Sequence, residues 1–101
     1  EIKADAVPIL PGALEFANMG IIPAGAYRNR EFIEDKVSIC ETVNRAVSDI
    51  LFDPQTSGGL LMAAAPDEAE KLEQELQNAG LPARIVGTIT EPGEVEIFVR
   101  G

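Results

Sequence analysis

Histidine and tryptophan are absent from the 101-residue chain, and Cys40 is its only cysteine. Without an imidazole, Ser-His-Asp and Cys-His catalytic arrangements and the commonest zinc sites are excluded. A single cysteine excludes an internal disulfide, favours a reducing, cytoplasmic setting, and is expected to be a small buried side chain. No apolar run approaches the roughly 20 residues that a bilayer-spanning helix needs.

Positive charge is also scarce, because 8 Lys and Arg residues face 17 Asp and Glu residues and the net charge is -9. Nucleic acids and anionic membranes both attract a basic surface, so we expect neither as a partner. The one basic cluster contains Arg28 and Arg30. It could bind a phosphate or a carboxylate. The neighbouring acids Glu31, Glu34 and Asp35 favour ordinary exposed ion pairs instead.

The spacing of apolar residues predicts three helices. They cover residues 10–19, 42–51 and 66–79, and Gly20 and Gly80 are placed to cap the first and the last of them. Residues 20–26 are predicted to be a turn-rich connection. The length fits one domain over residues 1–101. Because the chain opens without an initiator methionine or a signal-peptide pattern, we expect it to be a piece of a longer protein.

Five segments have strand-like patterns: residues 1–7, 37–39, 60–65, 84–90 and 94–99. The third is apolar on both faces, which is typical of a central strand covered on each side. The last two flank a Glu-Pro-Gly turn, which predicts an antiparallel hairpin. Strands interleaved with helices indicate an α/β (α+β) fold in which helices cover a mixed sheet.

Polar chemistry is concentrated in residues 53–59, between a helical and an apolar segment. The carboxylate of Asp53 is a suitable ligand for a hard cation such as Mg²⁺. Hydroxyls and backbone N–H groups that could bind an anion follow it, from Thr56, Ser57, Gly58 and Gly59. The alternative is a plain structural turn, in which Asp53 hydrogen-bonds its own backbone and the glycines let the chain turn sharply.

Three motifs resemble one known family in the same order along the chain. The string LFDPQTSGGLL at residues 51–61 is the specific one. The other two are residues 6–13 and residues 20–25, the latter closed by Asn29-Arg30. Together they resemble the C-terminal domain of the selenophosphate synthetases (selenide, water dikinases), which belong to the aminoimidazole ribonucleotide synthetase superfamily. The resemblance covers the whole chain.

The resemblance implies an ATP-dependent enzyme that converts selenide, ATP and water into selenophosphate, AMP and phosphate. It implies a three-layer sandwich with partial likeness to a ferredoxin-like fold, and a homodimer held mainly by an N-terminal ATP-binding domain. Asp53 matches a magnesium ligand of the family. The residues that match the loop facing the active site are Thr56, Ser57, Gly58 and Gly59.

The family's reactive cysteine or selenocysteine and its catalytic lysine belong to the N-terminal domain, and Cys40 does not match the former. We therefore expect no catalytic residue within these 101 residues and no synthetase activity from them alone. Two other readings stay open. One is another member of the superfamily, such as a thiamine-phosphate kinase or a hydrogenase-maturation protein, and the other is a free-standing ligand-binding module with ferredoxin-like topology.

Overall fold

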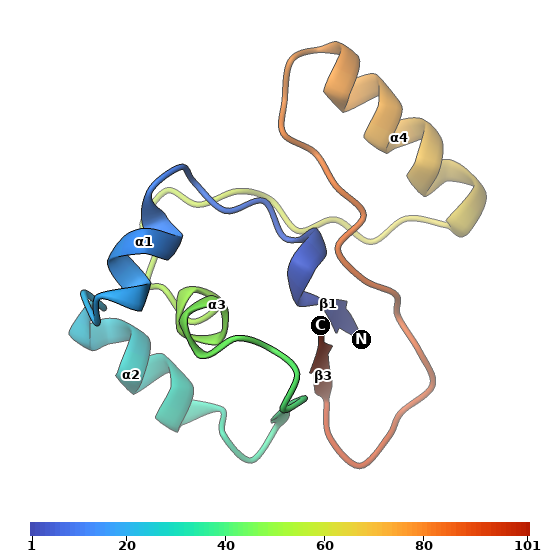
Figure 1. Ribbon diagram of the computed structural model, residues 1–101. Helices are drawn as coiled ribbons and strands as arrows, with labels where there is room; N and C mark the ends of the chain where they lie inside the picture. Colours follow the sequence, from blue (N-terminus) through green and yellow to red (C-terminus); the bar gives the residue numbers. More distant parts are fainter.

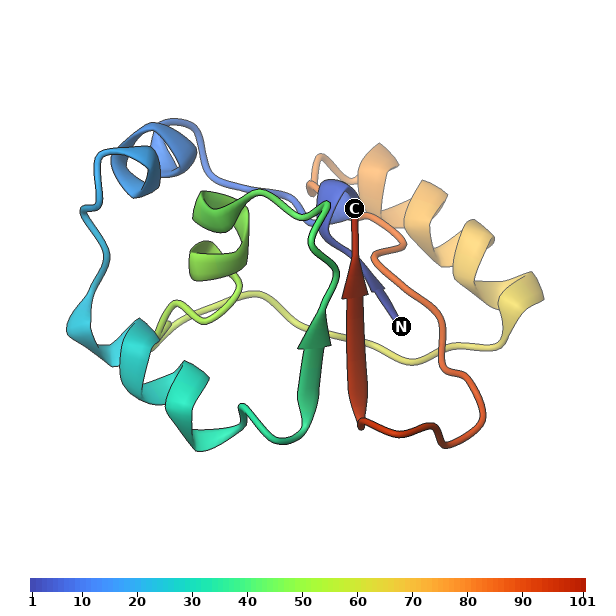
Figure 2. The same cartoon turned by 60° about the horizontal axis from the view of Figure 1, so that its bottom comes forward.

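The computed structural model describes residues 1–101, and its strands form a three-stranded parallel sheet in the order β1-β3-β2. β1 (Ile2–Lys3) and β2 (Val37–Ile39) flank β3 (Ile97–Arg100), which comes last in the sequence and lies in the centre. Figure 2 shows β2 and β3 side by side and pointing the same way. The register pairs Val99 of β3 with a residue on each side, so the first and last strands of the chain are neighbours.

The predicted hairpin is wrong, because β3 pairs in parallel with β1 and β2 and not with residues 84–90. The latter segment runs antiparallel to β1 instead. The backbone N–H of Lys3 donates to the carbonyl of Val86 at 2.8 Å, and that of Thr88 donates to the carbonyl of Glu1 at 2.9 Å. Gly87 permits this approach, since a Cβ there would lie 2.1 Å from the Glu1 carbonyl oxygen. Long-range pairing therefore overrides the local turn signal at residues 91–93.

The predicted central strand at residues 60–65 is also wrong, because this segment belongs to no strand. β3 occupies the central place in the sheet that the apolar run was expected to fill. The side chains of Leu60 and Leu61 are 88% and 82% exposed. An apolar run reports an affinity for burial but not a pairing partner, so the pattern alone could not place it.

The three predicted helices are present in shortened form as α1 (Ala13–Asn18), α3 (Arg45–Ile50) and α4 (Pro66–Asn78). Gly20 and Gly80 end α1 and α4 with φ of 78° and 81°, values that glycine adopts without strain. After each helix the next N–H groups bond back to its last turn, as in a Schellman motif. The strand predicted at residues 1–7 is only β1, and a short 3₁₀ helix η1 (Ala4–Ala6) follows it.

One helix, α2 (Ala24–Phe32), was not predicted, since residues 20–26 were expected to be a connection. Its only fully buried residue is Ala26. A helix that buries so little carries no clear apolar stripe, so its periodicity gives no signal. Pro23 immediately precedes it and Gly25 stands in its first turn, and both residues were read as turn formers.

The helices α1, α2 and α3 gather on one side of the strands, whereas α4 stands apart on the other (Figure 1). The buried apolar core is thin and consists of five small residues, which lie on η1, α1, α2, α3 and β3: Ala4, Ala17, Ala26, Ala46 and Val99. The radius of gyration is 14.4 Å, somewhat above the roughly 13 Å typical of this length. None of the helices has the length and apolar character that crossing a bilayer requires.

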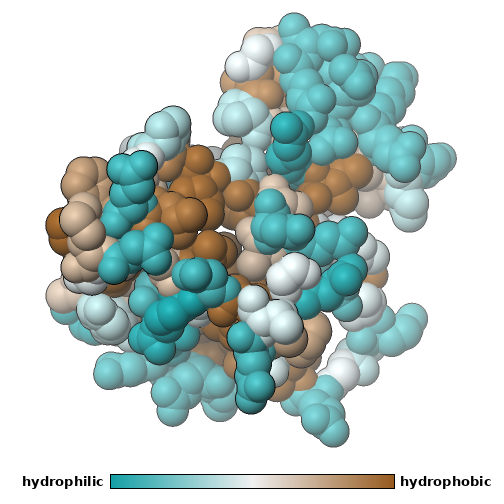
Figure 3. Space-filling view, viewed as in Figure 1, coloured by the Kyte–Doolittle hydropathy of each residue, from teal (hydrophilic) through white to brown (hydrophobic).

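The α/β class is therefore confirmed, and the three-layer sandwich and the ferredoxin-like likeness stay predictions. Apolar surface gathers beside α1 and toward the centre of the molecule, whereas polar side chains cover the outer face of α4 (Figure 3).

Two hydrogen bonds join helix α4 to the segment that follows it in the sequence. Its Gln77 amide donates to the Ala83 carbonyl at 3.0 Å, and its Glu73 carboxylate accepts from the Ile85 N–H at 2.9 Å.

Candidate functional site

Asp53 lies three residues beyond Ile50, the last residue of α3. Its N–H still donates to the Ile50 carbonyl at 3.0 Å, and Pro54 then prevents a further turn. The side chain is half-buried. In contrast to Asp49 one turn earlier, which is bound by arginine, the Asp53 carboxylate makes no hydrogen bond or ion pair with the chain. The structural-turn alternative, in which this carboxylate bonds its own backbone, is therefore not supported.

A shallow pocket of about 260 Å³ opens beside this carboxylate. Most of its lining is apolar, and Asp53 and Asn29 are the polar exceptions. The full lining consists of Asn29, Phe32, Ile33, Leu51, Phe52 and Asp53. Asp53 is the only charged residue of this lining, so it is the one group there that could attract a cation.

The other predicted site residues follow Asp53 on an exposed stretch and do not line this pocket. The hydroxyls of Thr56 and Ser57 make no hydrogen bond within the chain, and neither Gly58 nor Gly59 has a positive φ. A Cβ on Gly58 would lie 2.7 Å from the Gln55 amide oxygen, whereas a Cβ on Gly59 would meet nothing within 4 Å. The chain's own backbone thus gives no reason for a glycine at position 59.

Residues of α2 contact both sequence neighbours of Asp53, which are Phe52 and Pro54. The Asn29 amide Nδ2 donates to the Phe52 carbonyl at 2.9 Å, and the Arg30 guanidinium lies 4.4 Å from the centre of the Phe52 ring. On the other flank, a Cβ on Gly25 would lie 2.6 Å from Cγ of Pro54. Gly25 and Asn29 are four residues apart and so share one face of the helix. Sequence reasoning had given none of the three α2 residues a role at the loop.

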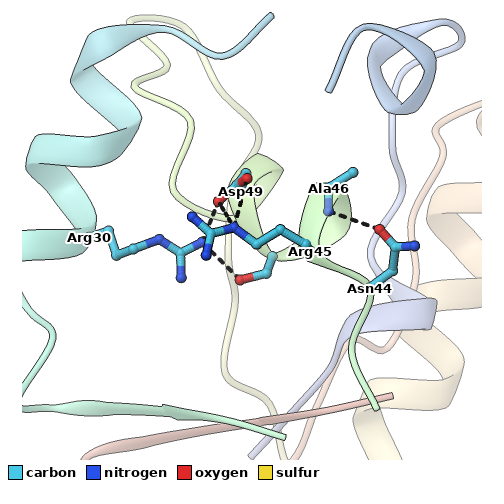
Figure 4. A network of polar contacts seen from close by, with 6 residues as sticks. Arg30, Asn44, Arg45, Ala46 and Asp49 are labelled. Atoms are coloured by element: carbon cyan, nitrogen blue, oxygen red, sulfur yellow. Dashed lines mark hydrogen bonds and ion pairs between the residues drawn. The ribbon is translucent and has the colours of Figure 1, made fainter. Parts of the chain in front are cut away.

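Arg30 also joins α2 to α3 through a half-buried ion pair (Figure 4). Its Nη2 donates to Asp49 Oδ1 at 2.6 Å and to the Ser48 hydroxyl oxygen at 2.9 Å. Arg45 Nε donates to both oxygens of the same carboxylate at 3.0 Å. Asn44 caps the start of α3, where its Oδ1 accepts from the Ala46 N–H at 2.8 Å. The contacts of Arg30 with Ser48 and Asp49 thus join α2 to the end of α3 from which the loop departs.

The expected pairing of the basic cluster with its neighbouring acids is therefore wrong for Arg30, whose partner Asp49 belongs to another helix. Arg28 is exposed and forms no ion pair. The exposed acids near Arg30 in the sequence compete poorly with the Asp49 carboxylate, which is 10% exposed, because water screens exposed ion pairs.

Cys40 is half-buried at the end of β2, not buried as expected. The Thr42 hydroxyl donates to its sulfur at 3.2 Å. This hydrogen bond favours the thiolate and lowers the pKa of the Cys40 thiol below its ordinary value.

The contact between Gly25 and Pro54 leads to a testable expectation. Replacing Gly25 by alanine should destabilise the protein by about 1–3 kcal/mol, because the new methyl group overpacks against the proline ring. Helix propensity acts in the opposite direction, since alanine is the better helix former by up to about 1 kcal/mol. Urea denaturation of the variant and the wild type measures this difference in the free energy of unfolding.

Gly59→Ala is the matched control for this measurement, because its added methyl group meets open space at an ordinary φ. We expect its stability to change by no more than about 0.5 kcal/mol. A Gly25→Ala variant as stable as the wild type would show that the Pro54 ring can pack against α2 even when residue 25 has a side chain.

No group of three or more acidic, histidine or cysteine side chains comes together to hold a metal ion. Asp53 is the only acidic residue that lines the pocket, so these 101 residues by themselves do not form a metal site.

The chain is similar to known proteins along its whole length. Residues 2–100 match the family described as AIR synthase related protein, C-terminal domain. It is 44% identical over 100 residues to a selenide, water dikinase of Clostridioides difficile and 46% identical over 100 residues to selenide, water dikinase 2 of Peptoclostridium acidaminophilum. A selenide, water dikinase of Pelobacter propionicus is 53% identical over 91 residues.

These matches cover 98%, 98% and 89% of the chain but only 29%, 28% and 26% of the relatives. The chain thus spans less than a third of the length of the proteins it resembles. The family resemblance predicted from the three sequence motifs is confirmed.

Proposed function

The chain belongs to the family of AIR synthase related C-terminal domains, and from this premise we propose that it is the C-terminal domain of an ATP-dependent selenide, water dikinase. In the proposed reaction ATP, selenide and water give selenophosphate, AMP and phosphate. Both phosphoanhydride bonds of ATP are broken, so one phosphoryl group passes to selenium and the other to water.

The observation that carries the proposal is the state of Asp53. Its half-buried carboxylate has no partner in the chain, although it heads the loop that resembles the family's active-site loop. A half-buried carboxylate without a partner in the chain is free to bind a cation. We propose that Asp53 is one ligand of the Mg²⁺ that accompanies ATP. Bound there, the ion would neutralise charge on the transferring phosphates.

The residues after Asp53 are proposed to face the phosphates. The free hydroxyls of Thr56 and Ser57 can donate to phosphate oxygens, and so can the backbone N–H groups of Gly58 and Gly59. The open space at Gly59 supports this role, because a side chain there would fill room that a ligand could occupy. The remaining ligands and the reactive groups are proposed to come from an N-terminal ATP-binding domain.

That domain is also the proposed partner of the exposed apolar segment that includes Leu60 and Leu61. Exposed apolar side chains in a row typically mark an interface. We further propose a homodimeric, cytoplasmic enzyme, since the sequence has a single cysteine and resembles that family. A three-layer sandwich remains our proposal for the finer architecture.

The test is an assay with ATP, Mg²⁺ and selenide, followed by phosphorus NMR. It uses the intact protein, which means the 101 residues together with the proposed N-terminal domain. We expect selenophosphate and AMP in equal amounts, and neither product from the 101-residue chain alone. The reason is that this chain supplies one metal ligand and a phosphate-facing loop but no nucleophile-activating group.

Omitting selenide is the control, and it should abolish selenophosphate. Selenophosphate made by the 101 residues alone would contradict the proposal that the reactive groups come from the N-terminal domain. Turnover of thiamine phosphate in place of selenide would instead assign the protein to another branch of the superfamily.

A further inference from the structure

We propose that Asn29 and Gly25 of α2 are positioning residues that fix the backbone on both sides of Asp53 and thereby aim its carboxylate. The catalytic consequence rests on the proposed function, whereas the positioning itself rests on contacts within the chain. We call this pair, with Arg30, the α2 clamp.

The first half of the clamp acts on the residue before Asp53. The Asn29 Nδ2 donates to the Phe52 carbonyl at 2.9 Å, and that carbonyl belongs to the peptide group that joins Phe52 to Asp53. A peptide group is planar, so fixing its oxygen also fixes the direction in which the Asp53 backbone leaves it. Arg30 holds the Phe52 ring from the same helix, at 4.4 Å from its centre.

The second half acts on the residue after Asp53. The Pro54 ring occupies the space beside Gly25 that a Cβ would fill. Proline has a fixed φ, so contact with its ring restrains the backbone as well as the side chain. Asp53 is thus held on both flanks, although its own carboxylate has no partner in the chain.

This arrangement separates positioning from ligand binding. If a side chain of this domain held the Asp53 carboxylate directly, a cation would have to displace that contact before binding. Holding the backbone instead leaves both carboxylate oxygens free while limiting where they point. Such preorganisation lowers the ordering cost of binding.

A purely structural explanation predicts a different outcome. The Phe52 carbonyl lies just beyond the end of α3, where carbonyls lack helical partners, so Asn29 would then only satisfy a polar group and join two helices. Under that explanation, removing the bond would weaken the fold generally. Under the positioning explanation, the effect is concentrated at Asp53, the one residue of the loop whose N–H is hydrogen-bonded within the chain.

The experiment compares Asn29→Ala with Asn18→Ala in the intact protein. Asn18 is a matched control, because its Nδ2 also donates to a carbonyl, that of Leu14, at 2.9 Å in an exposed setting. Hydrogen exchange, thermal unfolding and the Mg²⁺ dependence of turnover are measured for both. Loss of one such bond changes a local equilibrium by about three- to tenfold.

We expect Asn29→Ala to speed exchange of the Asp53 amide, which donates to the Ile50 carbonyl at 3.0 Å, by that factor and to raise the Mg²⁺ concentration for half-maximal rate similarly. Asn18→Ala should do neither, and both variants should lower the midpoint of thermal unfolding by similar amounts. Unchanged exchange of the Asp53 amide would overturn the proposal. So would a general rise in exchange with a much larger loss of thermal stability.

Asn29→Asp is the second variant, since it keeps the side-chain shape and removes the donor. It should reproduce the exchange result, and normal exchange in a folded Asn29→Asp protein would also overturn the clamp. Hydrogen exchange needs neither ATP nor metal, so it tests positioning alone. If exchange rises as expected while Asp53→Ala leaves turnover normal, the clamp stands and the proposed metal role of Asp53 falls.

Discussion

Replacing Asp53 by alanine in the intact protein is expected to lower selenophosphate formation by about a thousandfold, the scale associated with removing one preorganised electrostatic contact to the transition state. Stability should hardly change. The carboxylate makes no hydrogen bond or ion pair in the chain, so its removal breaks no internal contact. The midpoint of thermal unfolding should therefore stay within about 2–4 °C of the wild-type value. Steady-state assays and calorimetry on the same preparation measure both quantities.

Two further variants make this result specific. Asp53→Asn keeps the size of the side chain but removes its charge, so it should lose most of the activity as well. Asp35→Ala removes an exposed carboxylate away from the pocket, and it should retain wild-type turnover. Near-normal activity in Asp53→Ala would remove the central support for the proposed function.

Replacing Asp49 by alanine is expected to destabilise the protein by on the order of 3 kcal/mol, because removing one partner of a largely buried pair leaves the other without compensation. The Asp49 side chain is only 10% exposed and accepts from both Arg30 and Arg45. For a domain of this size the midpoint of thermal unfolding should fall by about 10 °C or more. Thermal and urea denaturation of the intact protein measure the loss.

Arg45→Ala is the matched control, since it removes a different partner of the same carboxylate. Arg45 is 72% exposed and lies four residues before Asp49 on α3, so its pair should contribute only about 0.3–0.5 kcal/mol. Equal losses in the two variants would show that the Arg30–Asp49 pair has no special role. A double variant, Arg30→Met with Asp49→Leu, should recover much of the stability by replacing the ion pair with apolar contact.

The helices that could be predicted from the sequence are those with an apolar stripe and a glycine stop. Helix α4 carries both signals and was predicted almost to its ends. Helix α2 has neither, because it buries little and begins among residues typical of turns. It contacts Phe52 and Pro54, which lie more than 20 residues away along the chain.

Strand pairing could not be predicted, for a related reason. Period-2 patterns at residues 84–90 and 94–99 indicated extended chain but not its neighbours. Residues 84–90 lie beside β1, and β3 lies between β1 and β2. The sheet is therefore parallel where a local hairpin was expected. The apolar run at residues 60–65 likewise suggested a strand although no partner is present in the sheet.

At the candidate site, the unusual composition of residues 53–59 was sufficient to identify the loop, and the motif at residues 51–61 was sufficient to identify the family. The family is confirmed by the comparison with known relatives. The roles of Asp53 and of the phosphate-facing residues remain predictions. The clamp on α2 escaped sequence reasoning because a hydrogen bond from Asn29 to a distant carbonyl leaves no local pattern.

The position of β3 between β1 and β2 has a consequence for how the chain folds during synthesis. Both pairings of the parallel sheet involve residues 97–100, so β1 and β2 cannot join that sheet until β3 has left the ribosome, although β1 can already pair with residues 86–88. The pair Ile2–Val99 closes a loop of nearly the whole chain, and contacts of such sequence separation form slowly. A nascent chain that ends before Ile97 therefore lacks the parallel sheet, and β1 can pair only with residues 86–88.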